Sequence, residues 1–219
     1  MKRTPEPELM DAPEQARAYA EADFNEPNRL FVNLFLELAI GSDAGHLIDL
    51  GCGPGDICIR LAGKMPDWQV VGLDAGPNML SLARAAVEQA GLNERIELVL
   101  ARLPDQLPAR RFDAVVSNSL LHHLPDPMVL WQSIRQLAAP GCLVQVMDLH
   151  RPDSPSAVDA IVDEHAADAP EVLRSDFRNS LHAAYTSDEV LAHINSSDLS
   201  NLTLSRPSDR HWMVQGRLD

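Results

Sequence analysis

The spacing of apolar side chains gives the chain a helical beginning, a central part of alternating strands and helices, and a different C-terminal part. Residues 1–12 carry several prolines and acids without periodicity, which predicts a frayed tail. Two helices are expected next, at about 13–22 and 28–40, and the second has apolar residues at helical spacing until Gly41 ends it. From His46 onward, short apolar runs alternate with helical stretches.

The central part contains five short apolar runs: HLIDL, WQVVGLD, RIELVL, FDAVVSN and CLVQVMDL. Strands that alternate with helices predict a parallel sheet. Residues 155–194 differ and indicate a helical insertion over the sheet edge, and the end of the chain predicts two strands around Arg206–Asp209. The expected fold is α/β, with a doubly wound, mostly parallel seven-stranded sheet, helices on both faces and a C-terminal antiparallel hairpin.

Composition and charge exclude several classes of function. The formal net charge is −14 without any block of Lys and Arg, which argues against a nucleic-acid partner. Cys52, Cys58 and Cys142 do not form the close pairs of zinc sites or disulfide frameworks, and this favours a reducing cytoplasm. No apolar run approaches the roughly 18 residues of a membrane span, and no apolar core follows the N-terminus, so neither a span nor a signal peptide is expected.

A glycine-rich loop separates the first predicted strand from the helix after it. Gly51, Gly53 and Gly55 stand where side chains would block the approach of a ligand to the backbone. Asp74 ends the second strand, 23 residues after Gly51, where a carboxylate accepts hydrogen bonds from ribose hydroxyls. A tight turn would explain the glycines alone, but loop, strands, helix and acid together favour a nucleoside site. NAD is disfavoured because its fingerprint needs glycine at position 56, which holds Asp56.

These motifs resemble those of the class I S-adenosylmethionine-dependent methyltransferases. The similarity covers roughly residues 45–150 and runs in order through Leu47–Gly55, Val71–Asp74, Arg111–Asn118, Leu121–Pro127 and Ala139–Leu143. It implies a Rossmann-like fold and an enzyme that transfers the methyl group of S-adenosylmethionine to a small molecule, giving S-adenosylhomocysteine. The expected organisation is an N-terminal tail and helical lid over residues 1–44 and a cofactor-binding domain over 45–219, with a helical insert at about 153–195.

The resemblance also implies roles for individual residues. Asp49 frames the methionine part of the cofactor, and Met79 packs beside the adenine. Arg102 departs from the family, in which an acidic side chain commonly accepts a hydrogen bond from the adenine amino group, so backbone amides and apolar walls such as Leu103 take over that contact. The expected cofactor-binding residues are Asp49, Gly51, Gly53, Gly55, Asp74, Ala75, Met79, Arg102, Leu103, Asn118 and Ser119.

The candidate catalytic residues are Asn118, His122, Asp148 and His150. Asn118 ends the fourth strand beside the expected methyl group. For His122 and its neighbour His123, general-base catalysis competes with a structural role of at least one of them in the turn. Asp148 and His150 point to the same side of an extended chain, where they either touch the acceptor or serve as a cap and a solvated side chain. Displacement at a sulfonium requires no metal, and the Asp and His residues show no recognisable ligand spacing, so no metal is expected.

The candidate substrate-binding residues are Tyr19, Phe24, Arg178, His182, Tyr185 and His211. The two aromatic residues near the N-terminus either fold over the cofactor as a lid or pack on the second helix. The Arg, His and Tyr near 176–184 have helical spacing and form either an anion-binding stripe or a solvated face. His211, in the final hairpin, either reaches the acceptor or lies on the surface of its strand without a role in binding.

The sequence narrows the class of methyl acceptor without identifying the molecule. Adenine and glutamine methylases carry an Asn-Pro-Pro-Tyr type sequence at the fourth strand, and this chain has Asn118-Ser119-Leu120-Leu121 there. A soluble metabolite is therefore the leading acceptor, with nitrogen, oxygen, sulfur or carbon as the methylated atom, and neither nucleic acid nor a membrane is an expected partner. A non-catalytic S-adenosylmethionine sensor or regulatory subunit is the alternative, and the oligomeric state stays open.

Overall fold

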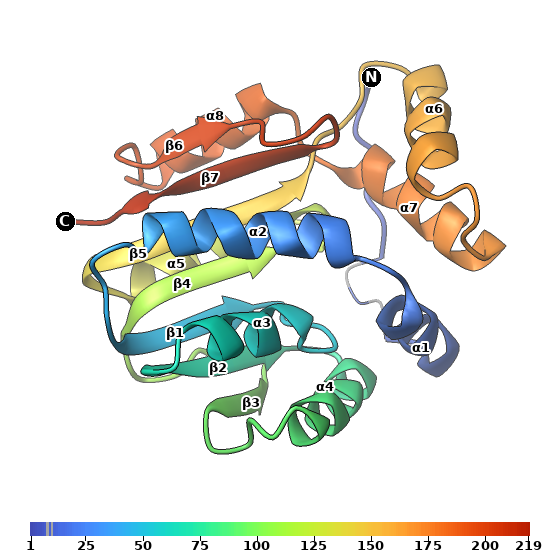
Figure 1. Cartoon of the computed structure of the whole chain (residues 1–219). Coiled ribbons are helices and arrows are strands. Elements are labelled where there is room, and N and C mark those ends of the chain that lie inside the picture. Colours follow the sequence, from blue (N-terminus) through green and yellow to red (C-terminus); the bar gives the residue numbers. More distant parts are fainter. Residues whose placement is uncertain (8, 10) are drawn as a thin grey trace.

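The computed structural model describes residues 1–7, 9 and 11–219, and its centre is a seven-stranded sheet (Figure 1). The strands are β1 (Gly45–Leu50), β2 (Trp68–Asp74), β3 (Ile96–Leu100), β4 (Phe112–Asn118), β5 (Ala138–Leu149), β6 (Thr203–Ser205) and β7 (His211–Arg217). Their order across the sheet is β3-β2-β1-β4-β5-β7-β6. The first five pair in parallel, and β7 is antiparallel to both β5 and β6. The predicted parallel sheet and closing hairpin are confirmed.

Helices cover both faces of the sheet. They are α1 (Pro13–Glu21), α2 (Asn25–Leu38), α3 (Asp56–Lys64), α4 (Pro77–Gln89), α5 (Met128–Leu137), α6 (Pro155–His165), α7 (Glu171–Ala183) and α8 (Ser187–Ser196), with a 3-10 turn, η1 (Leu121–His123). Successive strand residues point to opposite faces, so Leu47 packs in the core under α2, α3 and α4, whereas Ile48 packs in the core under α5 and α8. Among the described residues, no helix combines the length and apolarity that crossing a bilayer requires.

Two helices of the predicted insert, α6 and α7, lie over the carboxyl ends of the parallel strands, whereas α8 packs on a face of the sheet beside α5. Figure 1 shows α1, α6 and α7 gathered at the end of the sheet towards which β1, β4 and β5 run. A small apolar cluster of Leu149, Val158, Val162, Leu181 and Ala184 joins α6 and α7 to the end of β5. Ligands bind at the carboxyl ends of strands in sheets of this kind, so α1, α6 and α7 stand where they enclose a site.

The N-terminal segment, residues 1–7, is packed against the rest of the chain. The guanidinium group of Arg3 donates hydrogen bonds to the carbonyl oxygens of Ala183, at 2.5 Å, and His122, at 2.9 Å. It also lies over the ring of Tyr185, 4.2 Å from the centroid. The prediction of a frayed tail was wrong for this segment, because long-range contacts hold backbone that has no periodic pattern of its own.

Asp11 joins the N-terminal part of the chain to the start of α4. Its Oδ1 accepts hydrogen bonds from the backbone amides of Asn78, at 2.9 Å, and Met79, at 3.1 Å. The residue in the cap position, Gly76, has no side chain for this purpose. A carboxylate at a helix N-terminus satisfies free amides and interacts favourably with the helix dipole, so Asp11 caps α4 from a distant part of the chain.

Candidate active site

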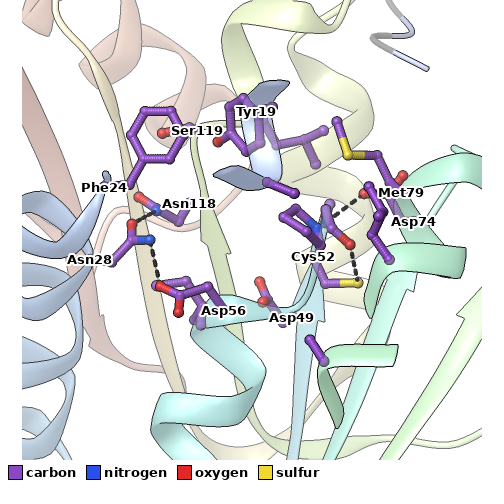
Figure 2. A pocket seen from close by; sticks show the side chains of 18 of the residues that line it. Tyr19, Phe24, Asn28, Asp49, Cys52, Asp56, Asp74, Met79, Asn118 and Ser119 are labelled. Atoms are coloured by element: carbon purple, nitrogen blue, oxygen red, sulfur yellow. Dashed lines mark hydrogen bonds between the residues drawn. The ribbon is translucent and has the colours of Figure 1, made fainter. Parts of the chain in front are cut away.

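A pocket of about 510 Å³ opens at the carboxyl ends of β1, β2 and β4 (Figure 2). The α1–α2 region forms its outer wall, including both predicted lid residues, Tyr19 and Phe24. The expected cofactor-binding residues that line it are Asp49, Gly51, Gly53, Asp74, Ala75, Met79, Arg102, Leu103, Asn118 and Ser119. The structure thus brings together residues from loops that are far apart in the sequence.

The glycine loop has the backbone geometry that its residue types suggested. Gly51 has φ +74°, and a Cβ there would lie 2.8 Å from Leu120 Cδ1. A Cβ on Gly53, with φ +52°, would meet nothing within 4 Å, so the backbone is open to the pocket at this residue. Gly55 was expected to bind the cofactor, but it is not among the described residues that line the pocket. It precedes α3 with φ +86°, where a Cβ would lie 3.2 Å from the Cβ of Ala83 in α4.

Asp74 ties the glycine loop to the end of β2. Its Oδ2 accepts a hydrogen bond from the Gly53 amide at 2.8 Å, and its Oδ1 accepts one from the Gly76 amide at 2.7 Å. Burial raises the pKa of Asp74 above its ordinary value, and these two amides oppose that rise. A carboxylate held in this way keeps lone pairs for further donors, such as hydroxyl groups of a ligand.

Asp49 lies at the floor of the pocket and is only 1% exposed. Its Oδ2 accepts a hydrogen bond from the Cys58 thiol at 3.4 Å, whereas its Oδ1 has no hydrogen-bond partner among the described residues. Burial is the main cause that raises the pKa of Asp49 to about 7. A buried carboxylate of this kind is suited to receive a cationic or hydrogen-bond-donating group of a ligand.

Asparagine and aromatic side chains form the opposite wall (Figure 2). Asn118 Nδ2 donates a hydrogen bond to Asn28 Oδ1 at 3.2 Å, and Asn28 Nδ2 donates one to Asp56 Oδ2 at 2.7 Å. The rings of Tyr19 and Phe24 lie with their centroids 4.6 Å apart. Burial raises the pKa of Tyr19 to about 12, so its phenol is neutral at physiological pH. This wall offers polar groups beside β4 and an apolar cover above them.

The loops that form the pocket lie in the part of the chain that is similar to a known protein family. Residues 48–144 match the family model described as a methyltransferase domain, and this stretch contains the glycine loop, Asp74 and Asn118. Over this stretch the chain is similar to a methyltransferase domain, and the match supports a class I methyltransferase. The seven-stranded sheet with its antiparallel β5-β7-β6 end is the Rossmann-like fold expected of such a methyltransferase.

Curated relatives match the chain over part of its length. A trans-aconitate 2-methyltransferase of Methylobacterium radiotolerans is 38% identical over 99 residues, which are 45% of this chain and 36% of the relative. A ubiquinone biosynthesis O-methyltransferase of Aliivibrio fischeri is 31% identical over 125 residues, 57% of this chain and 52% of the relative. The chain therefore spans about half the length, or less, of these two relatives.

Solved structures extend the likeness in fold to nearly the whole chain. The plantazolicin methyltransferase BpumL, crystallised with a pentazolic desmethylPZN analog and SAH, has a TM-score of 0.72 at 12% identity and covers 94% of this chain and 92% of its own. A SAM-dependent methyltransferase from Aquifex aeolicus has a TM-score of 0.65 at 15% identity, with coverages of 95% and 99%. At such low identity the likeness shows the fold alone.

Of the four candidate catalytic residues, Asn118 lines the pocket. His122 and Asp148 are buried behind it, with His122 Nδ1 against the Asp148 carboxylate. Burial lowers the pKa of His122, but Asp148 and Glu6 outweigh it and hold that pKa above its ordinary value. Neither His122 nor Asp148 is among the described residues that line the pocket. Their position therefore fits a structural role better than contact with an acceptor.

His150 and His211 also lie away from the lining that the structure describes. The His150 amide donates a hydrogen bond to the carbonyl oxygen of Arg210 at 2.8 Å, so this residue joins two backbone segments. His211 is buried at the start of β7 with its Nδ1 2.8 Å from Ser208 Oγ, and burial lowers its pKa to about 4. Contact of either side chain with a molecule in this pocket is not supported by their positions.

The polar stripe predicted near α7 needs correction. Arg178 forms an ion pair with Asp159 of α6 at 3.1 Å and is partly exposed, and His182 lies on α7 outside the described lining. Tyr185 is not on the helix, because α7 ends at Ala183 and Tyr185 then forms a β-bridge with His150, the residue after β5. The three side chains therefore do not form one substrate-binding face.

Several polar pocket residues were not among the expected site residues. Asn28 and Asp56 lie at the starts of α2 and α3, and His123, which was weighed as a general base beside His122 but not chosen, follows it in η1. The signal for Asp56 was its place directly after the glycine loop, where a helix N-terminus favours a carboxylate. For Asn28 no local pattern existed, because its role depends on the packing of α2 beside β4.

Proposed function

We propose that this methyltransferase transfers the methyl group of S-adenosylmethionine to a small molecule and releases S-adenosylhomocysteine. The observation that carries the proposal is the glycine loop tied to Asp74 at the floor of the pocket. Gly53 leaves the space that a ligand needs beside the backbone, and Asp49 has an unpartnered carboxylate oxygen nearby. The residues present thus fit an adenosyl ligand that bears hydroxyl groups and an ammonium group.

The side chains of the pocket give each part of such a ligand a partner. Asp74 accepts hydrogen bonds from ribose hydroxyls, and Asp49 balances the ammonium group. Met79 and Leu103 provide apolar walls for the adenine. Binding of the cofactor would supply an activated methyl group, because the carbon–sulfur bond of a sulfonium breaks readily.

The remaining task of the protein is alignment. With the cofactor bound, a lone pair of the acceptor would form the new bond to the methyl carbon, and the electron pair of the carbon–sulfur bond would stay on sulfur. Asn118 and Ser119, at the end of β4, orient the acceptor, and Tyr19 and Phe24 exclude water. Alignment of this kind supplies several kcal/mol, and in favourable cases about 7–11 kcal/mol.

The acceptor class follows from charge and pocket size. A pocket of about 510 Å³ that also holds the cofactor leaves room for a small metabolite. The net charge of −14 disfavours nucleic acid. Cys52, Cys58 and Cys142 are free thiols in the structure, which agrees with a reducing compartment such as the cytoplasm.

Calorimetric titration of the full chain with S-adenosylmethionine, S-adenosylhomocysteine and NAD tests the proposal. We expect both adenosyl ligands to bind and NAD not to bind. Labelled methyl transfer to a panel of hydroxy, carboxylic and amino compounds then tests catalysis. Binding of NAD alone, or of none of the three, contradicts the proposal, and binding without transfer to any acceptor favours the non-catalytic sensor.

The affinity for S-adenosylmethionine is expected to rise between pH 6 and 7.5. Asp49 must be ionised to balance the ligand's ammonium group, and its pKa of about 7 leaves it mostly protonated at pH 6. Its ionised fraction grows roughly eightfold over this range, so affinity should grow about fivefold or more. Calorimetry at several pH values measures the slope, and Asp49→Asn should bind more weakly and remove most of it. An equal slope in this variant contradicts the assignment.

A further inference from the structure

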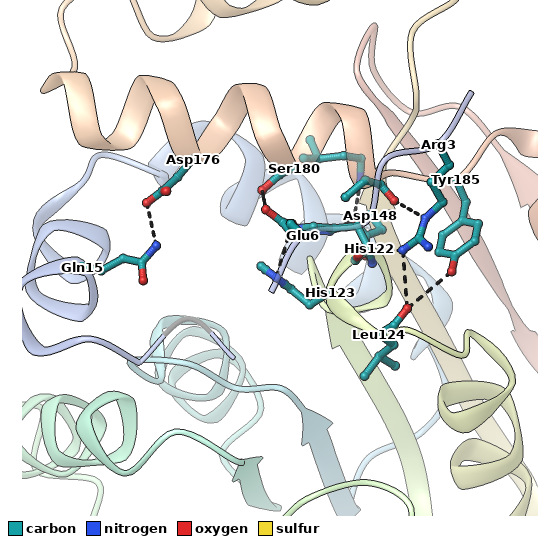
Figure 3. Close-up of polar contacts among 12 residues, drawn as sticks. Arg3, Glu6, Gln15, His122, His123, Leu124, Asp148, Asp176, Ser180 and Tyr185 are labelled. Atoms are coloured by element: carbon teal, nitrogen blue, oxygen red, sulfur yellow. Dashed lines mark hydrogen bonds and ion pairs between the residues drawn. The ribbon is translucent and has the colours of Figure 1, made fainter. Parts of the chain in front are cut away.

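A second group of chemically active side chains lies beside the pocket, between the N-terminal segment and η1. Glu6 Oε1 is 3.5 Å from His122 Nε2 and 3.3 Å from His123 Nδ1. The three atoms all lie within 4.8 Å of one another. Figure 3 shows Glu6 entering from the N-terminal segment between α7 and the two imidazole rings. In a tetrahedral zinc site with bonds of about 2.0–2.1 Å, neighbouring ligand atoms are about 3.3 Å apart, so the two measured distances match.

The side chains of this group are largely buried, and two of the three atoms that face one another have no hydrogen-bond partner among the described residues. The side chains of Glu6, His122 and His123 are only 9%, 4% and 14% exposed. Neither Glu6 Oε1 nor His123 Nδ1 has a hydrogen-bond partner among the residues that the structure describes. Buried polar atoms without partners are rare in proteins, and an ion is one of the explanations for them.

The outer contacts of the group are those of a supported metal site. His122 Nδ1 contacts the buried Asp148 carboxylate, which fixes the ring and turns Nε2 towards Glu6. Ser180 Oγ donates a hydrogen bond to the other carboxylate oxygen of Glu6, Oε2, at 3.3 Å (Figure 3). Histidine ligands of metals usually donate their second ring N–H to a carboxylate or a carbonyl, and carboxylate ligands are themselves hydrogen-bonded.

A second group in the described part of the chain provides a contrast. Glu164, His165 and Asp209 also lie within 4.8 Å of one another, but all three are exposed. Arg210 Nη1 is 3.2 Å from His165 Nε2 and 3.0 Å from Asp209 Oδ1, so a cationic side chain already neutralises this group. The group around Glu6 differs, since the guanidinium of Arg3 is bound to backbone carbonyls and the Tyr185 ring.

We propose that Glu6, His122 and His123 bind one divalent transition-metal ion, with Zn²⁺ as the best fit to two imidazoles and one carboxylate. Three protein ligands leave a fourth position for water or substrate, which is the arrangement of catalytic zinc sites. His123 lines the main pocket, as do its neighbours Ser119 and Leu120. On the basis of the proposed function, the fourth ligand is a hydroxyl or carboxylate oxygen of the methyl acceptor, and the ion anchors oxygen-bearing acceptors.

Metal binding can be measured on the full chain purified without a polyhistidine tag and freed of metal by a chelator. Titration with Co²⁺, which substitutes for Zn²⁺ and absorbs visible light, should show one equivalent bound with the strong bands of a four- or five-coordinate ion. Zn²⁺ should displace it. The variants Glu6→Gln and His123→Asn should weaken binding by more than the roughly 10–100-fold cost of losing an outer partner, and Ser180→Ala by about tenfold.

His165→Gln, in the exposed group, is the matched control and should bind Co²⁺ like the unmodified chain. Far-UV circular dichroism of each variant reports whether it is folded. Absence of Co²⁺ and Zn²⁺ binding in the unmodified chain overturns the proposal, as does binding that is unchanged in folded Glu6→Gln and His123→Asn. Because the titration contains no S-adenosylmethionine, metal binding without cofactor binding would overturn the proposed function alone, and the reverse result would overturn the metal site alone.

Discussion

Replacement of Asp74 by alanine is expected to weaken the binding of S-adenosylmethionine and S-adenosylhomocysteine at least 100-fold. The substitution removes the acceptor of ribose hydroxyls, and hydrogen bonds to a charged group contribute about 1.5–3 kcal/mol each. It also frees the Gly53 amide, which donates to Asp74 at 2.8 Å, so the glycine loop loses its tie to β2. Every 1.4 kcal/mol is a tenfold change in affinity. Isothermal titration calorimetry measures the loss directly.

Two further variants define what this result means. Asp67→Ala removes an exposed carboxylate just before β2 and should bind both ligands normally. Asp74→Asn keeps one oxygen acceptor without the charge, and its affinity should lie between those of Asp74→Ala and the unmodified chain. An Asp74→Ala protein that is folded and binds within threefold of the unmodified chain would show that the pocket holds its ligand in another way.

Replacement of Arg3 by alanine is expected to lower the free energy of unfolding by about 2–4 kcal/mol. Arg3 donates to the carbonyl oxygens of Ala183, His122 and Leu124, the last at 3.4 Å, and covers the Tyr185 ring. Without it these partly buried carbonyls lose a charged donor, and the N-terminal segment loses its link to α7 and η1. Urea unfolding monitored by circular dichroism gives the difference from the shift in midpoint at constant slope.

Lys2→Ala serves as the control for Arg3→Ala, since Lys2 is the neighbouring cation and is exposed. It should change the free energy of unfolding by less than about 0.5 kcal/mol, as surface substitutions usually do. If residues 1–7 were the frayed tail that their composition suggested, the two variants would behave alike. Equal stabilities for both would therefore contradict the packed N-terminal segment.

The sheet and its helices were predictable because their signals are local. Apolar runs of strand length, helical periodicity and turn residues each report on a few neighbouring positions, and together they gave the order of elements. The N-terminal segment has no such signal. Arg3 binds carbonyl groups 119 and 180 residues away, and only the folded chain brings them together.

Within the pocket, too, residues marked by a local sequence signal could be predicted, and residues placed by tertiary packing could not. The glycine loop and Asp74 were found because residue type and spacing identify them. The choice between His122 and His123 could not be made from the sequence, because in a 3-10 turn the direction of a side chain depends on the packing of that turn. The structure turns His122 inward to Asp148, and His123 towards the pocket.

The charges around the pocket bear on product release in the proposed reaction. Its described lining carries four carboxylates, those of Asp23, Asp49, Asp56 and Asp74, and two guanidinium groups, those of Arg60 and Arg102. If the pocket binds S-adenosylmethionine as proposed, this acidic excess attracts its sulfonium charge, and methyl transfer abolishes that charge. The pocket therefore attracts the thioether S-adenosylhomocysteine less strongly than S-adenosylmethionine. Loss of the charge in the chemical step thus favours release of the product and binding of the next donor molecule.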